Sequence, residues 1–382
     1  MIAVNQNIKI LRPKWKGAMT GRERFNRQMH YQSVDRCFNV EFGYWEENFS
    51  AWPMFRDNGI TDSGQANLAL NFDHRTEIGS SWGNLWLQPY FLGKVVRETE
   101  KTRIIQNGDG LLAEISKDGR SSIPHFLESS IKNPDDWKRC KEERFRIDDP
   151  ARKIDVAEIK SRLQTSGRDY PLGVHCGSMI GRARDMLTLE GLAYAIYDYP
   201  EMVEDMVETA CLIVEDFLDQ VLPAIDFDYA SGWEDICYNR GPLVSLDFFE
   251  HVLVPRYQRI FSKLRKFNID IFYTDCDGDL RPIIPLLLKS GFNTLFPFEV
   301  NGCGNPVDIL EQYEGQIRIL GGVDKMVMAE GPGPIRAYLE KLLPWVEKGG
   351  FIPFCDHRCP PNVSQENYLA YLDIKEELFG LH

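Results

Sequence analysis

Residues 269–325 read IDIFYTDCDGDLRPIIPLLLKSGFNTLFPFEVNGCGNPVDILEQYEGQIRILGGVDK, and this stretch decides the fold. It contains three short apolar runs, at 269–275, 293–299 and 317–324, whose β-branched and aromatic residues predict strands. A helical pattern fills each interval between them. Strands that alternate with helices of about 10–15 residues predict right-handed crossovers and a parallel sheet.

The same alternation extends outward from this stretch in both directions. Further strands are predicted at 171–178, 227–232 and 350–357, with amphipathic helices between them. With a strand at Cys37–Trp45 and less regular units before residue 171, the number of strands approaches the eight of a barrel. We therefore predict an α/β fold, a (β/α)8 TIM barrel with an N-terminal helical and β-rich elaboration. A doubly wound open sheet is the alternative, although no G-x-G-x-x-G motif follows the first strand.

The length of 382 residues fits a single barrel domain, because α/β barrels often exceed about 250 residues. We expect residues 1–35 to form an N-terminal extension that includes a helix beginning near Thr20. Within residues 85–127, short alternating runs are separated by Asn-Gly and Asp-Gly pairs, which predicts a β-rich excursion from the barrel. The sequence NPDDWKRCKEERF predicts a helix capped by Asn133 or Asp135.

Composition and charge exclude several classes of protein. Hydrophobic residues make up 43% and charged residues 26%, which excludes collagen-like and mostly disordered chains. A net charge of −13 does not favour binding to phosphate backbones, so we expect no nucleic-acid partner. No apolar run approaches the ~20 residues that span a bilayer, and the N-terminus lacks the apolar core of a secretory signal. Nine scattered cysteines predict reduced thiols, and we expect a cytoplasmic protein.

Polar side chains follow most of the predicted strands, at the end where a parallel barrel carries its active site. Asp275-Cys276-Asp277 is the strongest signal, because alternate residues of an extended segment point the same way. With the imidazole of His357, the carboxylates of Asp275 and Asp277 would form a three-ligand site for zinc or another divalent metal. Without a metal, the close like charges would raise the pKa of one carboxylate and create an acid/base pair suited to decarboxylation.

Further polar residues at strand ends are predicted to bind substrate. Each of them could instead be a packed or ion-paired structural residue, and for a lysine beside acidic residues the structural ion pair is the default. The predicted substrate-binding residues are His175, Glu234, Asp235, Glu299 and Lys325.

A family resemblance rests on segments that follow one another in a characteristic order. They are GRERFNRQMHYQSVDRCFNVEF (21–42), WEDICYNRGPLVSLDFFEHVLVPRYQRI (233–260), DCDGDLRPIIPLLLKSGFNTLFPFEV (275–300), ILGGVDK (319–325) and PPNVSQENYLAY (360–371). In these segments the chain resembles the uroporphyrinogen decarboxylase superfamily, which includes the corrinoid-dependent methyltransferases. The resemblance implies a TIM barrel, in agreement with the pattern of strands and helices.

The two branches of this superfamily imply different chemistry. In the methyltransferases a His-x-Cys pair and a later Cys bind zinc, and the resemblance places these positions at Asp275, Asp277 and His357. Harder ligands thus replace sulfur, which departs from a thiol-activating zinc site. The decarboxylases carry a histidine at the position of His357. Their arginine-rich segment, which binds the porphyrinogen carboxylates, has no clear counterpart near residues 22–45.

The leading hypothesis is an enzyme that transfers a methyl group at Asp275, Asp277 and His357. The group would pass between a small methylated compound and a corrinoid or other acceptor, and the resemblance implies a corrinoid carried by a partner protein and a homodimer. Two alternatives remain open. One is a metal-free decarboxylase of a tetrapyrrole or of a small carboxylic acid, and the other is a non-catalytic module that binds a corrinoid or tetrapyrrole.

Overall fold

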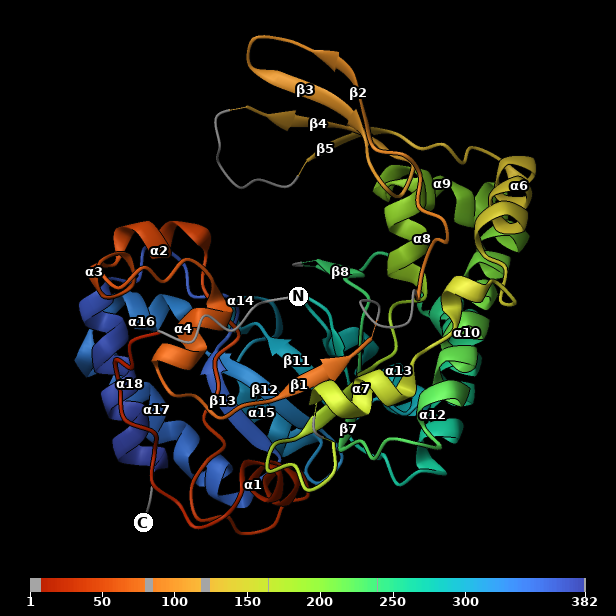
Figure 1. Ribbon diagram of the computed structural model, residues 1–382. Coiled ribbons are helices and arrows are strands. Elements are labelled where there is room, and N and C mark those ends of the chain that lie inside the picture. The colour runs from red at the N-terminus through yellow and green to blue at the C-terminus, as the bar shows by residue number, and fades with distance from the viewer. Residues whose placement is uncertain (1–7, 80–84, 118–123, 164, 239, 381–382) are drawn as a thin grey trace.

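The computed structural model describes residues 8–79, 85–117, 124–163, 165–238 and 240–380. At its centre, seven parallel strands are hydrogen-bonded in the order β1-β6-β7-β10-β11-β12-β13 (Figure 1). The predicted strands from residue 171 onward all belong to this sheet. The strands are β1 Thr76–Ile78, β6 Leu172–His175, β7 Tyr229–Trp233, β10 Phe272–Asp275, β11 Thr294–Phe298, β12 Arg318–Val323 and β13 Phe351–Cys355.

The strand order excludes the doubly wound alternative. Each strand of the sheet pairs with the one that follows it along the chain, whereas a doubly wound sheet reverses its order at a switch point. Right-handed crossovers that never reverse place the helices on one side, so the sheet curls around its other face. In the described part of the chain β1 and β13 do not pair. The sheet is therefore a curled half-barrel, consistent with a TIM-like barrel but not closed.

The segment Cys37–Trp45, predicted as a strand, is extended chain without a regular ladder. It forms a single parallel bridge, between Tyr44 and Cys359, in the residues after β13. The N–H of Phe38 donates to the side chain of Gln28 at 2.7 Å instead of to a strand. Because side chains accept the hydrogen bonds that a neighbouring strand would accept, this segment lies beside β13 without extending the sheet.

Helices pack on the outer face of the curled sheet. Two helices begin where the sequence predicted, near Thr20 and at Asn133, and a capping side chain is present at both. The Thr20 hydroxyl accepts a hydrogen bond from the N–H of Glu23, and the Asn133 side chain accepts from the first turn of its helix.

The helices are α1 Gly21–Met29, α2 Glu46–Ala51, α3 Pro53–Arg56, α4 Ser63–Ala69, α6 Pro134–Arg144, α7 Val156–Leu163, α8 Ile180–Leu187, α9 Leu189–Asp198, α10 Pro200–Val221, α11 Leu246–Phe248, α12 Val254–Arg265, α13 Ile284–Ser290, α14 Val300–Cys303, α15 Pro306–Gln312, α16 Lys325–Glu330, α17 Pro332–Lys348 and α18 Gln365–Phe379. Shorter helical turns are η1 Pro150–Arg152, η2 Phe249–Leu253 and η3 Arg281–Ile283, of which η2 is a π-helical turn.

Residues between β1 and α6 form a separate antiparallel sheet with the order β2-β3-β4-β5. It projects from the half-barrel (Figure 1). At its base, Leu111 and Phe126 line a cavity together with residues that follow the barrel strands. The four strands are β2 Lys94–Glu98, β3 Thr102–Gln106, β4 Leu112–Ser116 and β5 His125–Glu128, and a further hairpin pairs β8 Cys237–Tyr238 with β9 Gly241–Pro242.

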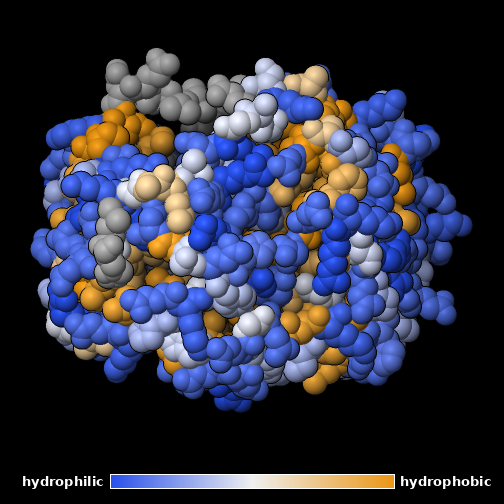
Figure 2. All heavy atoms as spheres, turned by 90° about the horizontal axis from the view of Figure 1, so that it is seen from below, coloured by the Kyte–Doolittle hydropathy of each residue, from blue (hydrophilic) through white to orange (hydrophobic). Residues whose placement is uncertain are grey.

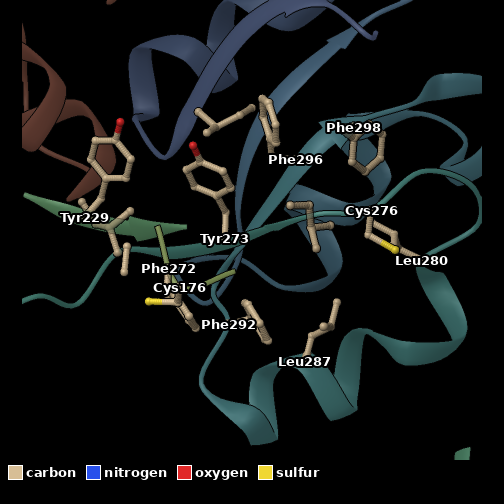
Figure 3. Packing of buried hydrophobic residues seen from close by; sticks show 14 of the residues in the cluster. Cys176, Tyr229, Phe272, Tyr273, Cys276, Leu280, Leu287, Phe292, Phe296 and Phe298 are labelled. Carbon is tan, nitrogen blue, oxygen red and sulfur yellow. The ribbon is translucent and has the colours of Figure 1, made fainter. Parts of the chain in front are cut away.

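The core lies between the sheet and its helices and is rich in aromatic rings (Figure 3). The rings of Phe272 and Phe292 stack with centroids 4.6 Å apart. All nine cysteines are buried and free, as the scattered spacing predicted. Among the described helices, none is both long and apolar enough to cross a bilayer. The face seen in Figure 2 is mostly hydrophilic, with hydrophobic residues in scattered patches.

Candidate functional site

Three side chains that could bind a metal ion lie together just after strands β10, β11 and β13. They belong to Asp277, Glu299 and His357, and one ligand atom of each lies within 4.8 Å of the other two. Oδ1 of Asp277 is 3.7 Å from Nε2 of His357. Within the described ranges this is the one group of three or more metal-ligating side chains with such spacing. We call it the Asp277–Glu299–His357 cluster.

A tight turn after β10 brings Asp277 toward Glu299. Gly278 has a φ of +85°, which favours glycine, and an added Cβ there would lie 2.8 Å from the backbone of Cys237. The Gly278 N–H donates to Oε2 of Glu299 at 3.1 Å. The turn therefore holds the Glu299 carboxylate through the Gly278 N–H and places the Asp277 carboxylate beside it.

The imidazole of His357 is held against an aromatic ring and is neutral. The ring of Phe42 meets it edge to face, with centroids 5.2 Å apart. Burial lowers the pKa of His357 to about 4, so the ring carries a free lone pair at neutral pH. A neutral imidazole is the form that binds metal ions.

Asp277 lacks a partner for its buried oxygen. Oδ1 is buried and has no hydrogen-bond partner among the described residues. Burial, together with the negative charges of Glu299 and Asp235, raises the pKa of Asp277 to about 7. An unpaired buried carboxylate oxygen beside other acids is a position where a bound cation would lower the electrostatic energy.

Lys325 lies behind the cluster and connects two acidic residues. Its Nζ donates to Oε1 of Glu299 at 3.2 Å and lies 3.3 Å from Oδ1 of the fully buried Asp356. Oδ2 of Asp356 accepts from the N–H of Val300, the residue after Glu299. These bonds orient Glu299, as partners behind a metal ligand do.

Asp275, predicted as the third ligand, does not join the cluster. It lines a cavity of about 460 Å³ inside the half-barrel, which we call the interior cavity. Asp277 instead lines the cavity of about 520 Å³ that Leu111 and Phe126 also line, which we call the mouth cavity. The prediction assumed an extended chain through both residues, but β10 ends at Asp275 and the chain then turns at Gly278. Alternation does not persist past the end of a strand, so the two carboxylates line different cavities.

The interior cavity contains a hydrogen-bonded network built on β1. The hydroxyls of Ser231 and Tyr273 donate to the two carboxylate oxygens of Glu77. Nδ1 of His175 lies 2.9 Å from the Ser231 oxygen, which accepts this bond because its own proton goes to Glu77. His175, predicted to bind substrate, thus faces the interior cavity, which Asp275 also lines.

Sequence reasoning missed the residues that β1 and the position before it contribute to this cavity. Arg75 and Glu77 both line it, and β1 is only three residues long. A three-residue strand gives no alternating apolar pattern, so no signal marked these side chains. Ser231 and Tyr273 lie inside strands that were predicted, but their polar partner Glu77 was not.

The remaining two predicted residues differ in their surroundings. Glu234 is 4% exposed, and its oxygens accept hydrogen bonds from the backbone at the start of α8 and from the Ser178 hydroxyl. It is therefore committed to capping α8. Asp235 lines the mouth cavity, and its carboxylate lies 3.8 Å from the Arg184 guanidinium. Burial raises the pKa of Asp235.

Comparisons with known proteins bear on the fold. No family model matches the chain, and no curated protein matches it. A solved methyltransferase from Methanosarcina mazei superposes with a TM-score of 0.60 at 14% identity, covering 95% of this chain and 100% of that one. A B12-independent methionine synthase from a Shewanella species, in complex with selenomethionine, gives a TM-score of 0.38 at 14% identity, covering 59% and 65%. The first likeness shows that this chain shares a fold with that methyltransferase over nearly its whole length.

Proposed function

We propose that this chain is an enzyme that transfers a methyl group, and that a divalent metal ion bound by Asp277, Glu299 and His357 activates the acceptor or donor. The observation that carries the proposal is the cluster itself, at the edge of the half-barrel where the parallel strands end. That edge is where active sites of parallel barrels lie. The shared fold with a methyltransferase is consistent with the same reaction class.

The donor set fits a catalytic metal. Two carboxylates and one neutral imidazole supply three protein ligands, which leaves a coordination position for substrate. Oxygen and nitrogen donors suit zinc, manganese and similar divalent ions. The orphaned Oδ1 of Asp277 is the feature that a cation would satisfy. Such a metal would act as a Lewis acid on a bound oxygen or sulfur atom.

The side chains around the cluster have distinct parts in this proposal. Lys325 and the Gly278 N–H hold the Glu299 carboxylate, so that its orientation does not depend on the substrate. Phe42 keeps the His357 ring in place and excludes water from one side of it. The mouth cavity of about 520 Å³ gives a small methylated compound access to Asp277 and Glu299. A corrinoid on a partner protein stays a proposal that rests on the sequence resemblance.

Metal analysis with four variants tests the ligand set. The protein is purified without chelator or affinity metal, and its metal content is measured by inductively coupled plasma mass spectrometry. Asp277→Asn, Glu299→Gln and His357→Ala each remove one proposed ligand. Asp275→Asn is the matched control, because it makes the same chemical change two residues away in the other cavity.

We expect about one divalent ion per chain in the wild type and in Asp275→Asn, and strong loss in the three ligand variants. Loss in Asp275→Asn together with retention in Glu299→Gln would instead support the ligand set predicted from the sequence. No metal in the wild type would refute the proposal. With metal present, methyl transfer from small methylated donors to a corrinoid acceptor is then assayed, and its absence from the ligand variants is expected.

A further inference from the structure

The cavity inside the half-barrel has a volume of about 460 Å³ and an arginine in its lining. Arg75 precedes β1, and its guanidinium lies 5.6 Å from the centroid of the Phe296 ring. In the described part of the chain, no carboxylate oxygen lies within ion-pair distance of this guanidinium, and it makes no hydrogen bond. The more deeply buried Arg24 and Arg168, by contrast, are bonded to aspartates.

Glu77, the acidic residue nearest in sequence, accepts its hydrogen bonds from other residues than Arg75. Both oxygens of Glu77 accept hydrogen bonds from the hydroxyls of Tyr273 and Ser231. The Ser231 oxygen in turn accepts from His175, and burial lowers the pKa of that imidazole, so it adds no positive charge at neutral pH. The network is thus internally satisfied. Glu77 and Asp275 line the same cavity and stabilise the charge of Arg75 from a distance, but among the described residues none accepts a hydrogen bond from its guanidinium.

Aromatic rings form much of the cavity wall. Tyr229 and Tyr273 stack with centroids 5.9 Å apart, and their hydroxyls point the same way (Figure 3). The ring of Tyr273 also contacts Phe296, with centroids 4.9 Å apart. Phe42 contacts Phe296 at 5.0 Å between centroids and also contacts His357 of the cluster. One ring therefore separates the arginine side of the cavity from the proposed metal site.

We propose that the interior cavity binds a small organic carboxylate, with Arg75 receiving the carboxylate group and the aromatic walls receiving the apolar body. The planar guanidinium matches a carboxylate with two parallel hydrogen bonds. This inference rests on the proposed function, because it assigns the methyl-transfer substrate to the class of carboxylic acids. The carboxylate would be anchored at Arg75 while the remainder of the molecule reaches past Phe42 toward the cluster.

Binding of benzoate and its neutral isostere benzamide tests the inference. Both are titrated by calorimetry into the whole protein, in the wild type and in Arg75→Gln, Arg75→Lys and Arg336→Gln. Arg336 is an exposed arginine on α17 and controls for the change in net charge. Thermal melting of each variant verifies folding, and Arg75→Lys retains the charge if Arg75→Gln folds poorly. Inorganic phosphate is titrated as a second anion.

We expect wild type to bind benzoate at least tenfold more tightly than benzamide, because a charge-assisted bidentate pair contributes at least that factor. Arg75→Gln should remove this preference, Arg75→Lys should retain part of it, and Arg336→Gln should leave it unchanged. Equal binding of the two probes, no binding of benzoate, unchanged binding in Arg75→Gln, or stronger binding of phosphate than benzoate would overturn the inference.

The same titrations on His357→Ala separate this inference from the proposed function. Metal in the wild type without benzoate binding would refute the carboxylate site and leave the metal-dependent reaction standing. Benzoate binding without metal would refute the metal site and leave the assignment of the cavity standing.

Discussion

Replacing Lys375 by methionine tests how the extended segment Cys37–Trp45 is held beside β13. Lys375 on α18 is fully buried, and its Nζ donates to Oε1 of Glu41 at 2.6 Å and to the carbonyl of Val40 at 3.0 Å. Glu41 is itself 2% exposed in its side chain and also accepts from the Tyr371 hydroxyl. The pair therefore fastens the segment to the last helix from inside the protein.

The expected loss follows from this burial. Removing one partner of a buried ion pair leaves an uncompensated charge and typically destabilises a protein by about 3–5 kcal/mol. Lys375→Met retains the length and apolar character of the side chain, so the loss reflects the charge. The double variant Glu41→Gln/Lys375→Met removes both charges, and we expect it to recover about 2 kcal/mol or more of that loss.

Urea unfolding followed by tryptophan fluorescence measures these differences, with Arg336→Met as the matched control. Arg336 pairs with Glu377, which lies on α18 as Lys375 does, but this pair is at the surface. Surface ion pairs contribute about 0–1 kcal/mol to the stability of a protein. A loss in Lys375→Met no greater than in Arg336→Met would refute the reasoning. So would a double variant that is less stable than Lys375→Met alone.

Other predictions concern the N-terminal region and the turn at the cluster. Asp35→Asn should destabilise the protein by about 2 kcal/mol at pH 7. Burial raises the pKa of Asp35, but the Arg24 guanidinium and the backbone N–H groups of Met19 and Ala18 outweigh burial, and the pKa falls to about 2. Because the pKa of Asp35 is lower in the folded state than the unfolded value of 3.8, its ionised carboxylate stabilises the protein above that pH. Urea titrations should therefore show the difference in unfolding free energy between wild type and Asp35→Asn falling by about half near pH 3. A difference that does not change with pH would contradict this reasoning. Gly278→Ala should lower metal content, because its Cβ clashes with the β8 backbone and displaces the N–H that holds Glu299. Gly59→Ala, with a φ of +67° and open space around the added Cβ, should retain the metal and lose only about 1 kcal/mol of stability.

The sequence predicted the strands from residue 171 onward because each lies between turn signals and an amphipathic helix. Their parallel pairing and order then followed from the connections. The helix near Thr20 and the capped helix at Asn133 were predicted as well, and in both of them a capping side chain bonds to its own first turn. The short strand β1 escaped prediction because three residues show no periodicity.

The candidate site was predicted only in part. Asp277 and His357 are in the cluster, as predicted, whereas Glu299 takes the place given to Asp275. The difference arises from the turn at Gly278, which the sequence pattern treated as continuing strand. Glu234 follows a strand end as Asp235 does, yet it is committed to capping α8.

The sequence by itself therefore determined three features through local chemistry. They are which segments form strands and helices, that the strands run parallel, and that polar residues gather at their carboxyl ends. Tertiary structure decided which of those residues meet. Side chains such as Gln28 replace a strand partner of the segment Cys37–Trp45, so the barrel stays open. Contacts between residues far apart in the chain likewise bring Glu299 to Asp277, and in the described ranges they leave the Arg75 guanidinium without a hydrogen bond to a carboxylate. Such contacts depend on turns and packing across the whole fold, which no local sequence pattern encodes.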